Sequence, residues 1–380
     1  MNIRSIAFYL PQFHPIPEND QWWGKGFTEW SNVTAAKPRF HGHYQPQLPT
    51  DLGFYDLRLP QVMDAQAELA RTYGIQGFCF YHYWFQGKRL LEQPIESYLD
   101  LGRPDFPFCL CWANENWTRS WNGRDRDVLL QQSYSEQDDL EHIEYLLRFF
   151  RDPRYIRIDG RPALLVYRVS NLPDPKATAE RWRHAAREQG VGEICLLSVE
   201  SILECHLDPR EIGFDFSVEF QPDWTVLPQP LRRSRPWRLL RRLGLSSRAY
   251  QQNRIMPYTS LVESMTRKPI PPYPRFPCIV PAWDNSSRRK DNATVFIEST
   301  PDLYGEWLLR TVKELPSRNL PEPIIFLNAW NEWAEGCHLE PDRRWGHAYL
   351  EATQRALQSS AATAWQDQGT TGTTEATDRP

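Results

Sequence analysis

The sequence lacks the features of a membrane-spanning, nucleic-acid-binding or disulfide-bonded protein. Its 380 residues contain no apolar run long enough to cross a bilayer. The 44 Lys and Arg residues nearly balance the 48 Asp and Glu residues, which argues against a nucleic-acid partner. The seven Cys residues form no Cys-x-x-Cys pair, so we expect a reducing compartment and no disulfide framework.

A secretory leader is also missing from the first residues. Residues 3–9 already form a strand-like apolar run, and no basic segment followed by an apolar core precedes them. We therefore expect a cytoplasmic protein, with peripheral attachment to the inner membrane as the alternative.

Eight short, β-rich apolar runs predict the strands of a parallel sheet. They cover residues 3–9, 76–81, 107–112, 162–167, 193–198, 214–219, 276–281 and 323–328. Helical periodicity separates several of them, at residues 59–73, 137–150, 177–189 and 301–315. This alternation predicts an α/β fold, a (β/α)8 TIM barrel. The alternative, an open doubly wound sheet, would place a Gly-rich turn after the first strand, where residues 9–14 read YLPQFH.

Three segments depart from the barrel pattern. Residues 10–58 form a long, aromatic-rich first loop, and long loops in compact domains are usually functional. Residues 222–275 form an insertion within a single barrel domain of residues 1–358, and its middle is rich in Arg. That stretch suits contact with an anionic membrane or ligand, and equally a solvated surface helix. Residues 359–380 have the composition of a disordered tail.

The segment at residues 328–336 carries the strongest functional signal. It follows the apolar run 323–327 and places Glu332 and Glu335 among Trp and Asn side chains. One carboxyl group of such a pair can act as an acid and the other as a base in glycoside chemistry, while indole rings stack on sugars. We predict both as catalytic. A solvated helix start is the alternative, but it gives no role to the neighbouring Trp residues.

Polar and aromatic residues follow nearly every predicted strand, where barrel enzymes place their sites. The predicted substrate-binding residues are Tyr9, His14, Trp30, Tyr81, His82, Trp84, Trp112, Asn114, Glu115, Trp117, Glu200, Glu219, Trp283, Asp284, Asn328, Trp330 and Asn331. Structural ion pairs remain the alternative for Glu115, Glu200 and Glu219, and a packed core imidazole for His82. We predict no metal and no cofactor, since His41 and His43 lack a third ligand nearby.

The sequence resembles the WbsX-type family, glycosyltransferases of bacterial surface-polysaccharide gene clusters. The resemblance rests on the runs AFYLPQFH (7–14), GFTEWSNV (26–33), GFCFYHYWF (77–85), WANENW (112–117) and residues 328–342, in this order along residues 1–355. That family is in turn similar to glycoside hydrolase family 99, (β/α)8 endo-acting α-mannosidases and mannanases with an Asn-Glu-Trp-x-Glu-Gly block, here residues 331–336. This second resemblance implies that Glu335 is the general acid/base, and that Glu332 polarises the sugar 2-hydroxyl to give a 1,2-anhydro intermediate with net retention.

Three functions follow from these observations. The first is a retaining, endo-type glycoside hydrolase or transglycosylase that acts on O-antigen or capsule polysaccharide. The second is a glycosyltransferase of O-antigen, lipopolysaccharide or capsule biosynthesis with a nucleotide-sugar donor. Against it, we identify neither an Asp-x-Asp metal-binding signature nor a Gly-rich phosphate loop. The third, a non-catalytic sugar-binding module, accounts for the aromatic residues but not for the paired acids.

Overall fold

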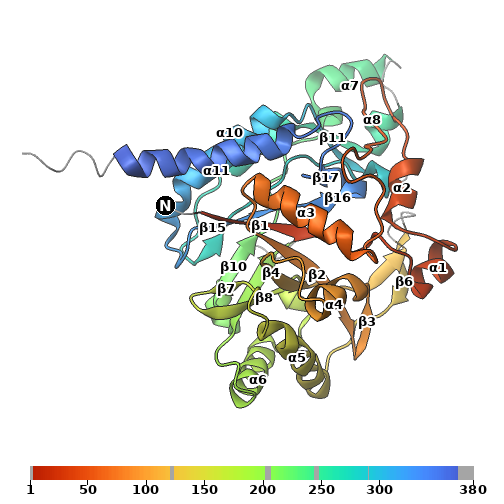
Figure 1. Cartoon of the computed structure of the whole chain (residues 1–380). Coiled ribbons are helices and arrows are strands. Elements are labelled where there is room, and N and C mark those ends of the chain that lie inside the picture. Colours follow the sequence, from red (N-terminus) through yellow and green to blue (C-terminus); the bar gives the residue numbers. More distant parts are fainter. Residues whose placement is uncertain (1–2, 120–123, 202–206, 244–247, 290, 367–380) are drawn as a thin grey trace, which may run out of the picture.

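The computed structural model describes residues 3–119, 124–201, 207–243, 248–289 and 291–366. Eight parallel strands form a nearly closed barrel in the order of the chain, and helices pack around it (Figure 1). The barrel strands are β1 (Arg4–Tyr9), β2 (Gly77–Phe85), β4 (Phe108–Trp112), β8 (Arg161–Val166), β9 (Cys195–Glu200), β10 (Phe216–Glu219), the pair β12 (Arg275–Phe276) and β13 (Cys278–Ile279), and β15 (Ile324–Leu327). The predicted TIM barrel and its eight strands are confirmed.

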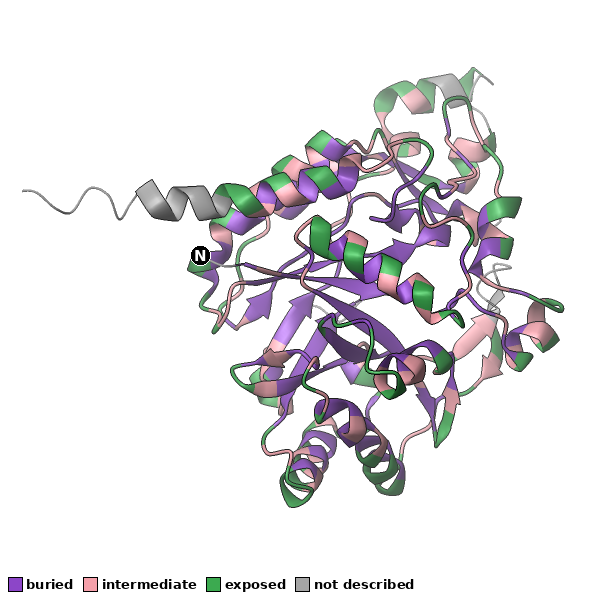
Figure 2. Cartoon of the chain, viewed as in Figure 1, coloured by how far each residue is buried: buried purple, intermediate pink, exposed green. Residues whose placement is uncertain are grey.

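Pro277 divides the seventh strand into two halves, because Pro has no N–H to give to a sheet. The first half, β12, pairs with β10, and the second half, β13, pairs with β15, which itself pairs with β1. The ring is therefore complete apart from this one break. The strands are buried along almost their whole length, as parallel strands covered on both faces must be (Figure 2).

The helices begin where the sequence supplies a cap. Ser135 and Asp174 accept a hydrogen bond from the first turn of α5 (Glu136–Phe150) and α6 (Pro175–Glu188), and Thr300 does so for α10 (Pro301–Glu314). With α3 (Pro60–Thr72), these helices confirm the four that periodicity predicted. The barrel also has α4 (Gln93–Asp100), α9 (Tyr258–Thr266) and α11 (Ala348–Gln366), which were not predicted.

The remaining elements lie in the connections. They are α1 (Pro17–Trp23), α2 (Glu29–Ala35), β3 (Lys88–Leu90), β5 (Trp117–Arg119), β6 (Arg124–Leu130), β7 (Arg157–Ile158), α7 (Arg235–Arg242), α8 (Arg248–Gln252), β11 (Arg254–Pro257), β14 (Thr294–Ile297), β16 (Asn331–Glu332) and β17 (Cys337–His338). Both α1 and α2 belong to the long first loop, and β11 pairs in parallel with β14 beside the barrel.

Two predicted boundaries differ from the structure. Residues 222–275 are not all an insertion, because α9 packs against α10 and the Tyr258 hydroxyl donates to the Val280 carbonyl, so this part belongs to the barrel. Helix α11 continues to Gln366, past residue 359 where a disordered tail was predicted, and residues 367–380 lie outside the described ranges. Within the described ranges, every helix is too short or too polar to span a bilayer.

Candidate functional site

A tight hairpin after β15 sets the positions of Glu332 and Glu335. Strands β16 and β17 pair in antiparallel fashion, and the 3-10 turn η7 (Trp333–Glu335) joins them. The turn ends at Gly336, which has a left-handed backbone with a φ of 61°. A Cβ atom there would lie 2.9 Å from Gln47 and 3.1 Å from Asp284, so only Gly fits this position without a shift of its neighbours.

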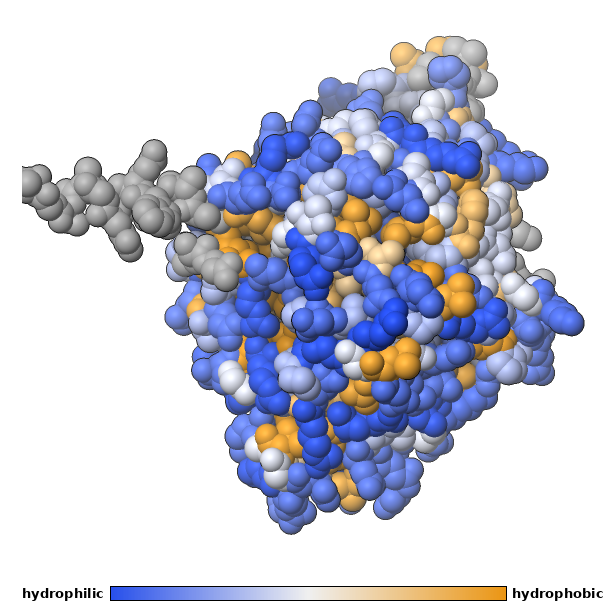
Figure 3. Space-filling view, in the orientation of Figure 1, coloured by the Kyte–Doolittle hydropathy of each residue, from blue (hydrophilic) through white to orange (hydrophobic). Residues whose placement is uncertain are grey.

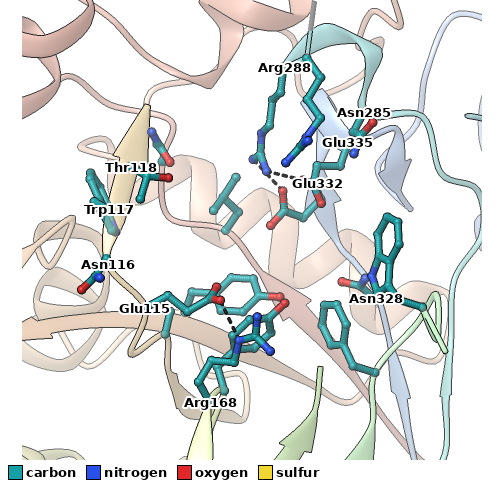
Figure 4. A pocket seen from close by; sticks show the side chains of 18 of the residues that line it. Glu115, Asn116, Trp117, Thr118, Arg168, Asn285, Arg288, Asn328, Glu332 and Glu335 are labelled. Carbon is teal, nitrogen blue, oxygen red and sulfur yellow. Dashed lines mark hydrogen bonds and ion pairs between the residues drawn. The ribbon is translucent and has the colours of Figure 1, made fainter. Parts of the chain in front are cut away.

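The two carboxylates of this hairpin meet at one guanidinium group, that of Arg288 (Figure 4). Its Nη2 atom lies 2.9 Å from Glu332 Oε2, and its Nη1 atom lies 2.9 Å from Glu335 Oε1. Its Nε atom donates to Glu29 Oε1 at 2.8 Å, from α2 in the first loop. One planar guanidinium therefore holds three carboxylates, which limits the separation of the contacted Glu332 and Glu335 oxygens to roughly 8 Å.

Burial and like charge determine where the proton of this cluster resides. Burial raises the pKa of Glu332 to about 8, against the opposing effect of Arg288 and with help from Glu335 and Glu29. Burial also raises the pKa of Glu29, again opposed by Arg288. For Arg288, burial opposes the charged form, but the three carboxylates outweigh it and hold the pKa well above its usual value. The cluster thus has Glu332 mainly protonated at neutral pH.

The carboxylate pair lines a large cavity at the carboxyl ends of the barrel strands, with a volume of about 1110 Å³. Its opposite wall carries a second ion pair, in which Arg168 Nε donates to Glu115 Oε1 at 2.7 Å (Figure 4). Aromatic rings form much of the wall between the two ion pairs. They belong to Trp23, Tyr81, Tyr83, Trp117, Tyr167, Phe220, Trp224 and Trp283.

Beneath the hairpin, the buried carboxylate of Glu340 fixes Trp333, the residue between the two acids. It accepts hydrogen bonds from Trp333 Nε1 at 2.6 Å, Tyr55 Oη at 2.8 Å and Gln66 Nε2 at 2.7 Å. Burial raises the pKa of Glu340 to about 7, and these donors oppose that shift. The hairpin thus rests on a satisfied polar network rather than on packing alone.

Removing this carboxylate is expected to lower stability strongly. Glu340→Ala leaves the donors of Trp333, Tyr55 and Gln66 buried without an acceptor, so we expect a loss of about 3 kcal/mol or more. Glu340→Gln keeps the shape and one acceptor oxygen, and its loss should be smaller. Urea unfolding would measure both, with the exposed Glu351→Ala as the control. Equal stability of Glu340→Ala and the parent would contradict the supporting role.

The structure brings part of the predicted substrate-binding set to the cavity. Besides the two catalytic candidates, the predicted residues that line it are Tyr81, Glu115, Trp117, Trp283 and Asn328. They come from four different barrel strands or the loops that follow them, as expected for a site at the carboxyl end of a barrel.

Three predicted residues point away from the cavity, because side chains alternate between the two faces of a strand. In β2, Tyr81 and Tyr83 line the cavity, whereas His82 and Trp84 face α5. His82 Nε2 lies 3.0 Å from Nε2 of His142, and burial lowers the pKa of His82 to about 3. Trp112 packs into the same aromatic cluster. His82 is therefore a core imidazole, as the alternative interpretation held.

Glu200 and Glu219 belong to a buried ion-pair network and do not line the cavity. The prediction that they bind substrate there is wrong. Glu200 Oε2 lies 2.9 Å from Arg275 Nη1, and Glu219 Oε1 lies 2.6 Å from Lys268 Nζ. Charges buried this deeply need direct partners, which these residues find in one another rather than in the cavity.

Other predicted residues hold the loops that form the site without lining the cavity. Tyr9 donates to Gln66, Trp30 donates to the Tyr55 carbonyl, and Asn331 accepts from the Leu10 N–H. Asn114 exchanges two hydrogen bonds with the Arg168 backbone.

Three further predicted residues are buried away from the cavity. Trp330 is in the core, and His14 is buried, which lowers its pKa to about 4. Asp284 binds His43 and Gln45 on the far side of the cavity wall.

Sequence reasoning missed the two residues that complete the carboxylate cluster. Glu29 lies within the run GFTEWSNV at residues 26–33, on which the family resemblance rests. That run could have drawn attention to Glu29, but the residue does not directly follow a predicted strand. Arg288 follows the 3-10 turn η5 (Asn285–Ser287) in a loop without a motif. Its position is fixed through the backbone, because Asp284 N donates to the Glu335 carbonyl at 2.7 Å and so ties the two loops together.

Whether the site could bind a metal ion depends on how its His, Cys, Asp and Glu side chains are grouped. Among the described ranges, no three His, Cys, Asp or Glu side chains are grouped as metal ligands would be. Asp125 and Asp127 in β6 have Asp-x-Asp spacing, which was overlooked in the sequence, and Leu129 of the same strand lines the cavity. The absence of a metal and a cofactor stays a prediction.

Comparison with known proteins identifies relatives over almost the whole chain. The family model described as Glycosyltransferase WbsX matches residues 5–353. The chain is 48% identical over 353 residues to the uncharacterized protein WxcX of two strains of Xanthomonas campestris pv. campestris. This match covers 93% of the chain but 49% of each relative, so the chain spans about half the length of these relatives.

Solved structures with a similar fold come from glycoside hydrolases. The GH99 endo-alpha-mannosidase from Bacteroides thetaiotaomicron has a TM-score of 0.58 at 13% identity, over 95% of this chain and 98% of that one. A glycoside hydrolase-like protein has a TM-score of 0.60 at 14% identity, over 94% of both chains. At identities this low, the similarity shows only that the folds are alike. The extent of the family match, by contrast, shows that the chain belongs to the WbsX glycosyltransferase family.

Proposed function

We propose that this chain cleaves or transfers glycosyl units of a bacterial surface polysaccharide with retention of configuration. The observation that carries the proposal is the meeting of Glu332 and Glu335 at Arg288 in the wall of a 1110 Å³ cavity. That volume exceeds the needs of a single sugar ring, which favours an oligosaccharide and an endo-type reaction. The aromatic walls suit stacking on the C–H faces of sugars.

The two carboxylates take different roles in this proposal. Glu332 accepts the proton of the sugar 2-hydroxyl while that oxygen bonds to the anomeric carbon and the glycosidic bond breaks. Glu335, which is 23% exposed against 8% for Glu332, gives its proton to the leaving oxygen. In the second step, water or a sugar hydroxyl gives its proton to Glu335 and opens the 1,2-anhydro ring. Glu332 then returns its proton to the 2-oxygen, and both acids are restored.

This scheme predicts a distinct dependence on pH. Glu332 must be ionised to accept a proton, and its pKa of about 8 leaves only a minority ionised at pH 7. We therefore expect the ionised fraction of Glu332, and with it the rising limb of kcat/KM, to grow about tenfold per pH unit up to about pH 8. Initial rates of glycan cleavage between pH 5 and 10 would measure this. A kcat/KM without a rising limb below pH 8 would mean that Glu332 acts in its protonated form, and would exchange the two roles.

The reaction itself can be tested on purified O-antigen and capsule glycans. Mass spectrometry of the products should detect fragments several sugars long, and the product anomer, followed by NMR, should match that of the substrate. Fragments of inverted configuration would overturn the mechanism. A polysaccharide panel left intact by the full-length protein, together with nucleotide-sugar consumption, would overturn the hydrolase proposal.

A nucleotide-sugar glycosyltransferase is the second candidate, favoured by the Asp-x-Asp spacing of Asp125 and Asp127 in the sequence of β6, the strand whose Leu129 lines the cavity. Such a pair can hold the divalent cation that accompanies a nucleoside diphosphate. Thermal shift with a panel of nucleotide sugars and Mn²⁺ separates the candidates. Stabilisation that requires Mn²⁺ and is lost in Asp127→Asn would support the transferase, and unchanged melting with every donor would support the hydrolase.

A further inference from the structure

Residues 224–262, the basic segment, contain eight Arg and no Asp, Glu or Lys. The whole chain has a net charge of −4, so this segment has the opposite sign to the rest of the protein. Such a concentration of one charge attracts an anionic surface or ligand. The Arg residues are Arg232, Arg233, Arg235, Arg238, Arg241, Arg242, Arg248 and Arg254.

Helix α7 arranges part of this charge beside exposed apolar side chains. Arg235, Arg238 and Arg242 are spaced three and four residues apart, so they form one row along the helix. Leu239 and Leu243, four apart, lie beside that row and are 58% and 61% exposed. A row of Arg flanked by exposed Leu is the pattern of a helix that lies in the plane of a membrane interface.

The helix is held on the domain with its apolar flank outward. The Trp237 ring stacks on Tyr250 of α8 with centroids 4.1 Å apart, and Arg232 donates to the Gln251 carbonyl. In Figure 1, α7 lies at the outer edge of the molecule, where Figure 3 shows hydrophobic and hydrophilic side chains together. Trp237 thus packs against the domain, while Leu239 and Leu243 stay exposed.

The basic segment also reaches the catalytic cavity. The 3-10 turn η4 (Leu231–Arg233), which precedes α7, contacts β11. Arg254, the first residue of β11, is exposed and lines the cavity. Whatever binds α7 therefore lies next to one wall of the site.

We propose that the basic segment docks this domain on an anionic phospholipid bilayer. The Arg row of α7 contacts lipid headgroups, and Leu239 and Leu243 enter the interface. A soluble polyanion such as RNA would use the Arg residues but give the two exposed Leu residues no role, whereas a bilayer uses both. The inference goes beyond the proposed function and does not depend on it. Its consequence is that the cavity wall at Arg254 faces the membrane, which suits a glycan carried on a lipid.

Sedimentation with sucrose-loaded vesicles tests the proposal on the full chain. We expect binding to phosphatidylcholine vesicles that contain phosphatidylglycerol, weak binding to phosphatidylcholine alone, and release at high salt. The variant R235Q/R238Q/R242Q should bind roughly 100-fold more weakly, at about fivefold per Arg. The variant L239Q/L243Q should also lose affinity while keeping its charge. All substituted side chains are exposed, so thermal unfolding should not change.

A matched control removes three positive charges elsewhere. Arg151, Lys176 and Arg187 are exposed around α5 and α6, far from α7 in Figure 1, and R151Q/K176Q/R187Q should bind vesicles like the parent. Equal losses in both triple variants would overturn the proposal, because net charge alone would then explain binding. Failure of the parent protein to bind either vesicle type would also overturn the proposal. So would binding to RNA that L239Q/L243Q does not weaken, and that result would assign the segment to a soluble polyanion.

Discussion

Replacing Glu335 with Gln is expected to lower the rate of glycan cleavage by roughly 10³-fold, with little change in folding. General acid catalysis contributes 10²- to 10⁴-fold in enzymes, and Gln cannot donate a proton to the leaving oxygen. Gln can still occupy the same volume and accept a hydrogen bond from Arg288, whose Nη1 atom lies 2.9 Å from the carboxylate. The loss should therefore appear in kcat, with KM nearly constant.

The exposed Glu180→Gln in α6 is a suitable control, because it removes a carboxylate remote from the cavity. Circular dichroism and thermal unfolding would show whether both variants fold like the parent. A Glu335→Gln protein that cleaves glycans at the parental rate would remove the proton-donor role. The aromatic cavity would then be a binding site whose chemistry lies elsewhere.

Replacing Arg288 is expected to disable the site through the protonation of its carboxylates. In Arg288→Gln, Glu29 and Glu332 lose the cation that opposes their raised pKa values. The pKa of Glu332 should rise above 8, so less of the ionised form remains at pH 7. We expect kcat/KM at pH 7 to fall by roughly 10²-fold and the rising limb of the pH profile to move to higher pH.

The shift of the pH profile distinguishes this effect from a simple loss of structure. Arg288→Lys keeps the charge but cannot bind three carboxylates with one planar group, so it should restore the position of the profile and only part of the rate. The exposed Arg58→Gln, whose side chain forms an ion pair with Asp56, is the control. An Arg288→Gln protein with lower activity but an unmoved pH profile would show that Arg288 acts by shape alone.

Individual strands of this fold were predictable because each is a local feature of the chain. The apolar run at 323–327 became β15, and the run at 276–281 became β12 and β13, with a break at Pro277 that the absence of a backbone N–H explains. Helix α9 was missed because its residues lie in a segment dominated by Arg and Pro. Helix α11 was missed because its Ala- and Thr-rich end resembles a tail.

The residues of the candidate site fall into two groups, those whose position follows from their neighbours in sequence and those that only the tertiary structure brings together. The chain by itself determined the eight strands and the position of Glu332 and Glu335 just after the last of them, because strand period and apolar runs are properties of neighbouring residues. Only the tertiary structure decided that Arg288 and Glu29 join these acids, and that His82 faces a helix while Tyr81 and Tyr83 face the cavity. Contacts across 44 or 259 residues, and the face of a strand that becomes the interior, depend on how the strands close into a ring. Patterns among neighbouring residues do not predict which side chains this closure brings into contact.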